Sequence, residues 1–174
     1  MPRRTATIDT SCLIALFHLG LLEKLADILD RVHIPKQVQE EISKKRSQRR
    51  RLRSVLRKSA LYHPCTVGDP FRVTVLLQDR PKKLGKPKAD RGEAEAVIQA
   101  TQVNATIVLV DDPLGRQWAE NHRIEPHGMI WVLRELRRIE VITDLRPAFR
   151  TLRKIDYRLP PDQIRKLLIE FEEA

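Results

Sequence analysis

The sequence predicts an α/β fold in which helices cover a mainly parallel β-sheet. Short apolar, β-branched runs alternate with segments whose apolar residues recur at helical spacing, which is typical of β-α-β connections. The clearest run, residues 105–110 (ATIVLV), shows no alternation of polar and apolar residues, as in a central parallel strand. A length of 174 residues suits one domain, predicted to span 1–174.

The elements expected in the first quarter of the chain follow from two short apolar runs and from the residues that interrupt them. Gly20 separates two helical segments, and Pro35 suits the first turn of a helix. Val38 and Ile42 have i, i+4 spacing, so we expect them on one face of that helix. The predicted elements are a strand over 5–9, helical segments over 12–16 and 21–29, a strand over 32–34, and a helix from residue 35.

The rest of the chain follows the same alternation, except that residues 59–91 show the weakest pattern. Within them, 72–77 (RVTVLL) is predicted to be a strand and 79–92 an exposed loop. Gly92 is expected to open a helix over 93–102, whose first-turn acids suit the helix dipole. The remaining predicted elements are the strand 105–110, a helix from Pro113, a helix over 129–138, and two helices in the C-terminal third.

The net charge of +10 is concentrated in one segment. Residues 44–58 (KKRSQRRRLRSVLRK) hold nine Lys or Arg and no acid, so the remainder of the chain sums to only +1. This segment belongs to a predicted basic insertion over about 44–91. It could bind RNA, dock an acidic partner, or form a solvated helix face. The residues predicted to contact RNA within it are Arg49, Arg50, Arg51 and Arg53.

Several classes of function are disfavoured by composition. Two cysteines are too few for a disulfide framework, so a reducing cytoplasm is the expected location. The first residues lack the apolar run of a signal peptide, and no apolar stretch is long enough to span a membrane. Eight aromatic residues argue against a stacking platform for single strands. The five histidines show no zinc-ligand spacing.

Four short acidic segments are the main functional signal, because buried carboxylates are costly unless their charge is compensated. Convergent carboxylates suit Mg²⁺ or Mn²⁺, which prefer oxygen ligands and support phosphodiester hydrolysis. Taken singly, each segment could instead be a helix cap, a dipole partner or a solvated surface. The segments contain Asp9, Glu40 and Glu41, Glu93 and Glu95, and Asp111 and Asp112.

These motifs resemble those of PIN-domain ribonucleases, specifically the prokaryotic branch of toxins from toxin–antitoxin pairs. TATIDTSCLIAL is similar to the family's opening strand with its first metal-binding Asp, and IPKQVQEEI to its Pro-x-x-Val-x-x-Glu helix. GEAEAVIQA and IVLVDDPLGRQWA resemble the third and fourth motifs. By this resemblance the catalytic acids are Asp9, Glu41, Glu93 and Asp112, with Glu95 and Asp111 as alternative metal ligands, Ser11 orienting the first carboxylate or binding water, and Arg116 contacting phosphate.

The resemblance covers about residues 5–170 and implies a five-stranded, parallel α/β/α sandwich. The chain departs from the family in its long, charged segment between the second and third motifs. It also has Val110 where a hydroxyl residue often precedes the last acids. A small antitoxin protein and a homodimer are implied as partners. The dimer surface would be the helix 129–139, with Met129, Trp131, Val132 and Leu136, although these could equally be core residues.

The sequence therefore predicts a Mg²⁺- or Mn²⁺-dependent endoribonuclease, a hydrolase that cuts RNA. The alternative is a non-catalytic RNA-binding or scaffolding module that has kept the same fold.

Overall fold

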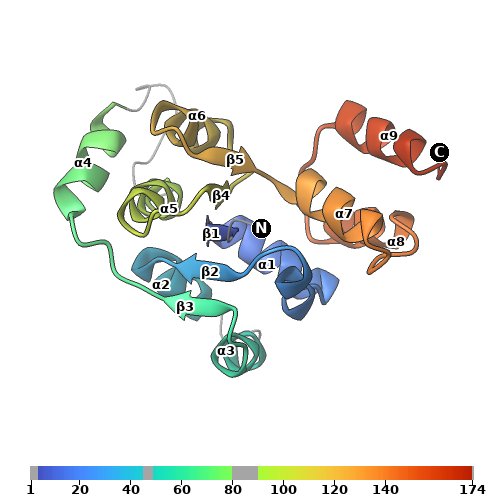
Figure 1. Cartoon of the computed structure of the whole chain (residues 1–174), viewed down its shortest axis with the longest axis horizontal. Coiled ribbons are helices and arrows are strands. Elements are labelled where there is room, and N and C mark those ends of the chain that lie inside the picture. The colour runs from blue at the N-terminus through green and yellow to red at the C-terminus, as the bar shows by residue number, and fades with distance from the viewer. Residues whose placement is uncertain (1–3, 45–48, 80–89, 174) are drawn as a thin grey trace.

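A five-stranded sheet lies at the centre of the protein, described by a computed structural model for residues 4–44, 49–79 and 90–173 (Figure 1). All strand pairs are parallel and the order is β3-β2-β1-β4-β5. The strands are β1 (Thr5–Ile8), β2 (Arg31–Ile34), β3 (Tyr62–Pro64), β4 (Ile107–Leu109) and β5 (Glu125–His127). This confirms the predicted parallel α/β fold with five strands.

Helices cover both faces of the sheet. One face carries α4, α5 and α6, and the other carries α1, the 3-10 helix η1 and α7 (Figure 1). The helices are α1 (Thr10–Leu19), η1 (Glu23–Asp27), α2 (Lys36–Lys44), α3 (Arg49–Lys58), α4 (Pro70–Gln78), α5 (Arg91–Gln102), α6 (Pro113–Asn121), α7 (Met129–Arg138), α8 (Arg146–Lys154) and α9 (Pro161–Glu170). The two apolar clusters that these layers enclose form the core.

The strand predicted over 72–77 is wrong, because this segment forms the helix α4. Asp69 accepts hydrogen bonds from the backbone amides of Phe71 and Arg72, and Pro70 occupies the first turn. Val73 and Leu76 are buried at i, i+3 spacing, whereas Phe71 is exposed. The helix cap and this helical burial pattern override the β-propensity of the β-branched residues.

Other differences concern short elements. The helix predicted over 21–29 is the 3-10 segment η1, and β3 and β5 have no counterpart in the predicted order. Both strands are three residues long and lie at the edges of the sheet. Strands this short give too little periodicity to recognise. Predictions for residues 45–48 and 80–89, in the basic segment and the loop, lie outside the described residues.

The helix proposed as a dimer surface is part of the core. Met129, Val132 and Leu136 in α7 are at most 1% exposed, and Trp131 stacks on His127 with the ring centroids 4.3 Å apart. The apolar face of α7 is therefore covered within one chain.

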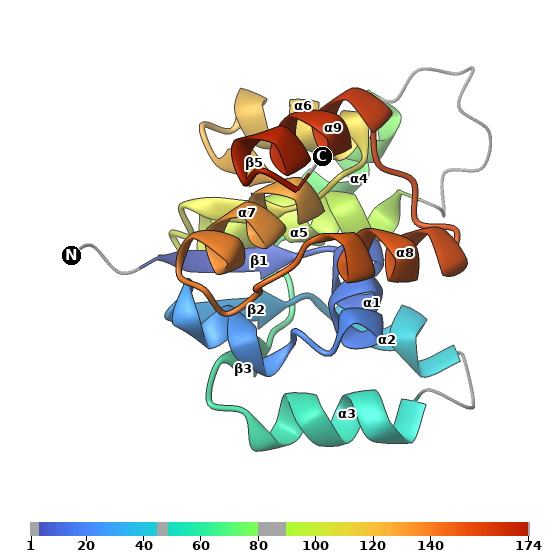
Figure 2. The same cartoon turned by 90° about the vertical axis from the view of Figure 1, so that its right-hand side faces the viewer.

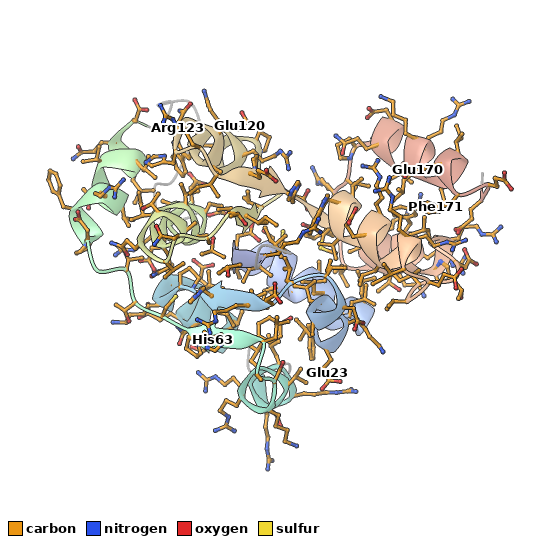
Figure 3. The ribbon with its side chains drawn as sticks, in the orientation of Figure 1. Glu23, His63, Glu120, Arg123, Glu170 and Phe171 are labelled. Carbon is orange, nitrogen blue, oxygen red and sulfur yellow. The ribbon has the colours of Figure 1, made fainter. Side chains whose placement is uncertain are left out.

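The last three helices form a layer fastened by ion pairs. Glu170 accepts from Arg134 at 2.9 Å, and Glu173 accepts from Arg137 at 2.8 Å and from the Leu145 amide at 2.7 Å. Glu170 and Phe171 lie between α9 and α7 (Figure 3). Helix α8 packs against α1 and lies near the carboxyl ends of the strands (Figure 2).

No described helix is long and apolar enough to cross a membrane.

Candidate active site

Two of the predicted acids reach the same edge of the sheet because their strands are parallel neighbours. Asp9 follows β1 and Asp112 follows β4, and Ile8 is in register with Leu109. The amide of Asp9 continues this pairing by donating to the Leu109 carbonyl at 3.1 Å. The carboxyl edge of the central strands therefore carries both acids, as expected for a functional edge in such sheets.

Asp9 is fully buried at the start of α1. Its carboxylate caps the helix by accepting from the Cys12 amide at 2.7 Å and from the Ser11 hydroxyl at 2.8 Å. Burial raises the pKa of Asp9 to about 6, with a smaller upward contribution from the charge of Asp111. The structure therefore holds a buried carboxylate in one fixed orientation.

The two neighbouring acids after β4 have different surroundings. Asp111 Oδ2 accepts from the Tyr157 hydroxyl at 2.5 Å and the Met129 amide at 2.9 Å. Its Oδ1 lies so close to Gly128 that a Cβ there would come within 1.8 Å. Asp111 thus joins β4 to the start of α7.

Asp112 is exposed and caps α6. It accepts from the amides of Leu114 at 2.8 Å and Gly115 at 3.2 Å, both through Oδ1. No contact among the described residues uses its Oδ2. Asp112 is thus exposed, with one oxygen outside its helix cap, whereas Asp111 Oδ2 is engaged by Tyr157 and Met129.

The two acids of α5 also differ. Glu95 is 7% exposed and both its oxygens are engaged, accepting from the Gln37 amide at 2.9 Å and from Arg91 at 3.1 Å. Glu93 Oε2 is buried and has no hydrogen-bond partner in the described structure. Because buried polar atoms are usually paired, this oxygen indicates a missing partner.

Glu41 connects the second acidic segment to the first. It accepts from the Thr10 hydroxyl through Oε2 and from the Gln37 side chain at 2.8 Å through Oε1. Gly92 lies against it, since a Cβ at that position would be 3.4 Å from Glu41 Oε2. Glu40 lies on the solvent side and pairs with Lys36.

These contacts bring together Asp9, Glu41, Glu93 and Asp112, which we call the acidic cluster. Burial, followed by the charge of Asp9 and then those of Asp112 and Glu41, raises the pKa of Glu93 to about 8. Gly115 lets α6 pack closely against α5 at Glu93, because a Cβ at residue 115 would lie 3.3 Å from Glu93 Cβ. Four carboxyl groups are thus close together, and among the described residues Glu93 forms no ion pair with a basic side chain.

Within the described residues, no three His, Cys, Asp or Glu side chains already form a ligand set for a metal ion. The oxygen-only donors nevertheless suit a hard divalent cation, and the unpaired Glu93 oxygen is the kind of atom such an ion would satisfy.

The basic residues have a different arrangement. Arg116 donates to the Val110 carbonyl at 3.3 Å, which holds it in the first turns of α6 near Asp112. In α3, Arg50, Arg51 and Arg53 are exposed, but α3 lies beyond β3, at one edge of the sheet (Figures 1 and 2). The prediction for the Arg49 side chain lies outside the described structure. The fold therefore does not place α3 directly at the acidic cluster.

Three residues around the site were not singled out from the sequence. Thr10 and Gln37 bind Glu41, and Tyr157 binds Asp111 from a position 46 residues further along the chain. Thr10 could have been found from the sequence, because it directly follows Asp9 in the first acidic segment. Tyr157 could not, because its role depends on where α8 places it.

A family model described as a PIN domain matches residues 5–173. The chain belongs to the PIN-domain family. No curated protein is significantly similar to it. PIN domains are generally nucleases that act on RNA and typically use divalent metal ions, so the fold is that of a nuclease and the coarse class of activity is hydrolysis. The match confirms the expected family.

Proposed function

We propose that this PIN domain is a divalent-metal-dependent endoribonuclease that hydrolyses RNA phosphodiester bonds at the acidic cluster. The observation that carries the proposal is the buried Glu93 oxygen, which has no hydrogen-bond partner among the described residues and lies near three further carboxylates. A buried carboxylate without a partner lowers the free energy of unfolding, and such groups gather at functional sites.

Within this site each acid has a distinct part. Asp9, Glu93 and Asp112 would hold Mg²⁺ or Mn²⁺, with Glu41 as the outer acid, and Glu95 and Asp111 would support the fold through the contacts they already make. Ser11 and the Cys12 amide keep Asp9 oriented, and Thr10 and Gln37 do the same for Glu41. A divalent ion, when bound, would polarise the phosphate and activate water.

Arginines would bind the phosphates that flank the cleaved bond. Arg116 is held beside Asp112 by its bond to the Val110 carbonyl. The exposed arginines of α3 border a groove of about 740 Å³ at the β3 edge. Replacing Arg49, Arg50, Arg51 and Arg53 by Gln should flatten the dependence of RNA affinity on salt. An unchanged slope would refute a binding role for α3.

The test of catalysis compares Asp9→Asn and Asp112→Asn with Glu120→Gln. Glu120 is exposed near the far end of α6, so its substitution serves as a matched control (Figure 3). We expect both Asn variants to lose Mg²⁺- or Mn²⁺-dependent cleavage of single-stranded RNA while keeping the far-ultraviolet circular dichroism of the wild type. Full activity in both Asn variants would refute the assignment.

A non-catalytic RNA-binding or scaffolding role is the second candidate. It is favoured by the absence of a ready-made set of three metal ligands among the described residues. Calorimetric titration with Mn²⁺ separates the two functions. Saturable binding that Asp9→Asn abolishes supports the nuclease, whereas no heat at millimolar metal supports the scaffold.

Because the motifs resemble those of toxins, we also propose that the protein is a cytoplasmic toxin and that a small antitoxin protein binds it. We further propose that it forms a homodimer. Because the apolar face of α7 is buried, a dimer would use another surface. On α4, Phe71 is 73% exposed and Val75 is 45% exposed, one helical turn apart. Sedimentation analysis of Phe71→Ser would test this surface, since an unchanged dimer would exclude it.

A further inference from the structure

We infer that the groove between α8 and α9 binds single-stranded RNA and leads it to the acidic cluster. This inference rests on the proposed nuclease function and adds the route by which the substrate reaches the site. The groove has a volume of about 710 Å³, and its lining includes Arg153, Arg158 and Arg165.

One side chain links the groove to Asp111, which lies next to the acidic cluster in the chain. Tyr157 lines the groove, and its hydroxyl donates to Asp111 at 2.5 Å. Asp111 precedes Asp112 in the chain, and its charge acts on Asp9. Tyr157 therefore connects the lining of the groove to the residue that precedes Asp112.

The charge of this region suits a polyanion. Residues 145–168 contain seven Lys or Arg and two Asp, a net charge of +5 that the larger basic segment obscures in the overall sum. Within the described residues, Arg153 and Arg165 form no ion pair. Arg158 lies 3.8 Å from Asp156, but both side chains are about 90% exposed, so this pair is weak. All three guanidinium groups can therefore bind phosphate.

The lining of the groove also suits unpaired bases. Phe149 and Tyr157 are half-buried aromatic residues within it, and Leu159 and Pro161 add apolar surface. A basic groove with aromatic side chains is the arrangement that binds single strands by phosphate contact and base stacking. The fold places two of the eight aromatic residues of the chain in this groove.

The test removes three charges from the groove and, as a control, three from the opposite edge of the sheet. The groove variant carries Arg153→Gln, Arg158→Gln and Arg165→Gln. The control carries Lys24→Gln, Arg31→Gln and Arg123→Gln, which are exposed residues before or at the amino ends of strands. Both variants lose the same net charge, so a difference between them reports position.

Fluorescence anisotropy with a labelled single-stranded RNA, in EDTA to prevent cleavage, measures affinity at about 50–200 mM salt. Loss of three phosphate contacts should lower the slope of log affinity against log salt by about 2 and weaken binding roughly a hundredfold at 0.1 M salt. The control should bind like the wild type. In cleavage assays with metal, the groove variant should show a raised KM and an unchanged kcat.

The possible failures are distinguishable. A wild-type protein that neither binds nor cleaves RNA overturns the proposed function together with this inference. A wild type that cleaves RNA, with equal affinity and KM in the groove variant, overturns the inference alone. If the groove variant loses binding to a labelled Glu- and Leu-rich amphipathic peptide while its RNA affinity is unchanged, the inference is also overturned and the groove is assigned to a protein partner.

Discussion

Replacing Glu93 by Gln should stabilise the metal-free protein at alkaline pH. The pKa of the folded-state carboxyl is about 8, whereas its ordinary value is 4.5. Between these two pH values the folded state binds more protons than the unfolded state, so stability falls as pH rises through this window. The loss is complete above about pH 8, where Glu93 must be charged among the other acids.

The pKa difference corresponds to a free energy of the order of 5 kcal/mol. Glu93 is not completely buried, so solvent screens part of this term. We therefore expect Glu93→Gln to exceed the wild type in free energy of unfolding by about 2–3 kcal/mol at pH 9. At pH 5, where Glu93 is protonated, the two proteins should be nearly equal.

Urea unfolding in EDTA at pH 5, 7 and 9 measures this effect, with Glu120→Gln as the exposed control. Asp9, whose pKa is raised to about 6, contributes a similar loss mainly below pH 6 in both proteins. The difference between pH 7 and pH 9 therefore belongs to Glu93. A variant that loses as much stability as the wild type over this range would refute the account of Glu93.

The remaining predictions concern the supporting contacts. Glu95→Gln should lower the free energy of unfolding in urea by about 1–3 kcal/mol, because it weakens charge-assisted hydrogen bonds, and should keep substantial RNA cleavage. Glu93→Gln should instead keep the stability of the protein and lose RNA cleavage. Equal loss of cleavage in the two variants would contradict these separate roles. Tyr157→Phe should lower the free energy of unfolding by about 1–2 kcal/mol through the lost bond to Asp111, and an unchanged value would show that this bond is not formed. Gly128→Ala should lower the melting temperature by several degrees because its methyl group would overlap Asp111, and a wild-type melting temperature would exclude this close packing.

The amino-acid pattern predicted the class of fold and the order of the acids. Residues 105–110 were recognisable because a central parallel strand is apolar on both faces. Asp9 and Asp112 could be placed at one sheet edge because parallel strands all end on the same side. The segment 72–77 was mistaken for a strand, because its β-branched residues outweighed the cap at Asp69 and Pro70.

Which acid of each neighbouring pair is already engaged could not be obtained from the sequence. Glu93 and Glu95 are two residues apart on one helix. Arg91 is a local partner of Glu95, but only the position of the Gln37 amide shows that the second Glu95 oxygen is also occupied. Asp111 is likewise occupied by Tyr157, from the distant layer of C-terminal helices. Such contacts depend on how separate segments pack, and local sequence does not encode them.

The sequence by itself thus determined that acids gather at the carboxyl edge of a parallel sheet, because strand direction follows from the alternation of strands and helices. Only the tertiary structure decided which acid of the cluster has an oxygen without a partner among the described residues, and which basic surface lies beside Asp111. Helix α3, the described part of the most basic segment, lies beyond β3, whereas arginines of α8, of α9 and of the segment between them line a groove beside Asp111. Charge density is a local property of the chain, but proximity to the acids depends on packing.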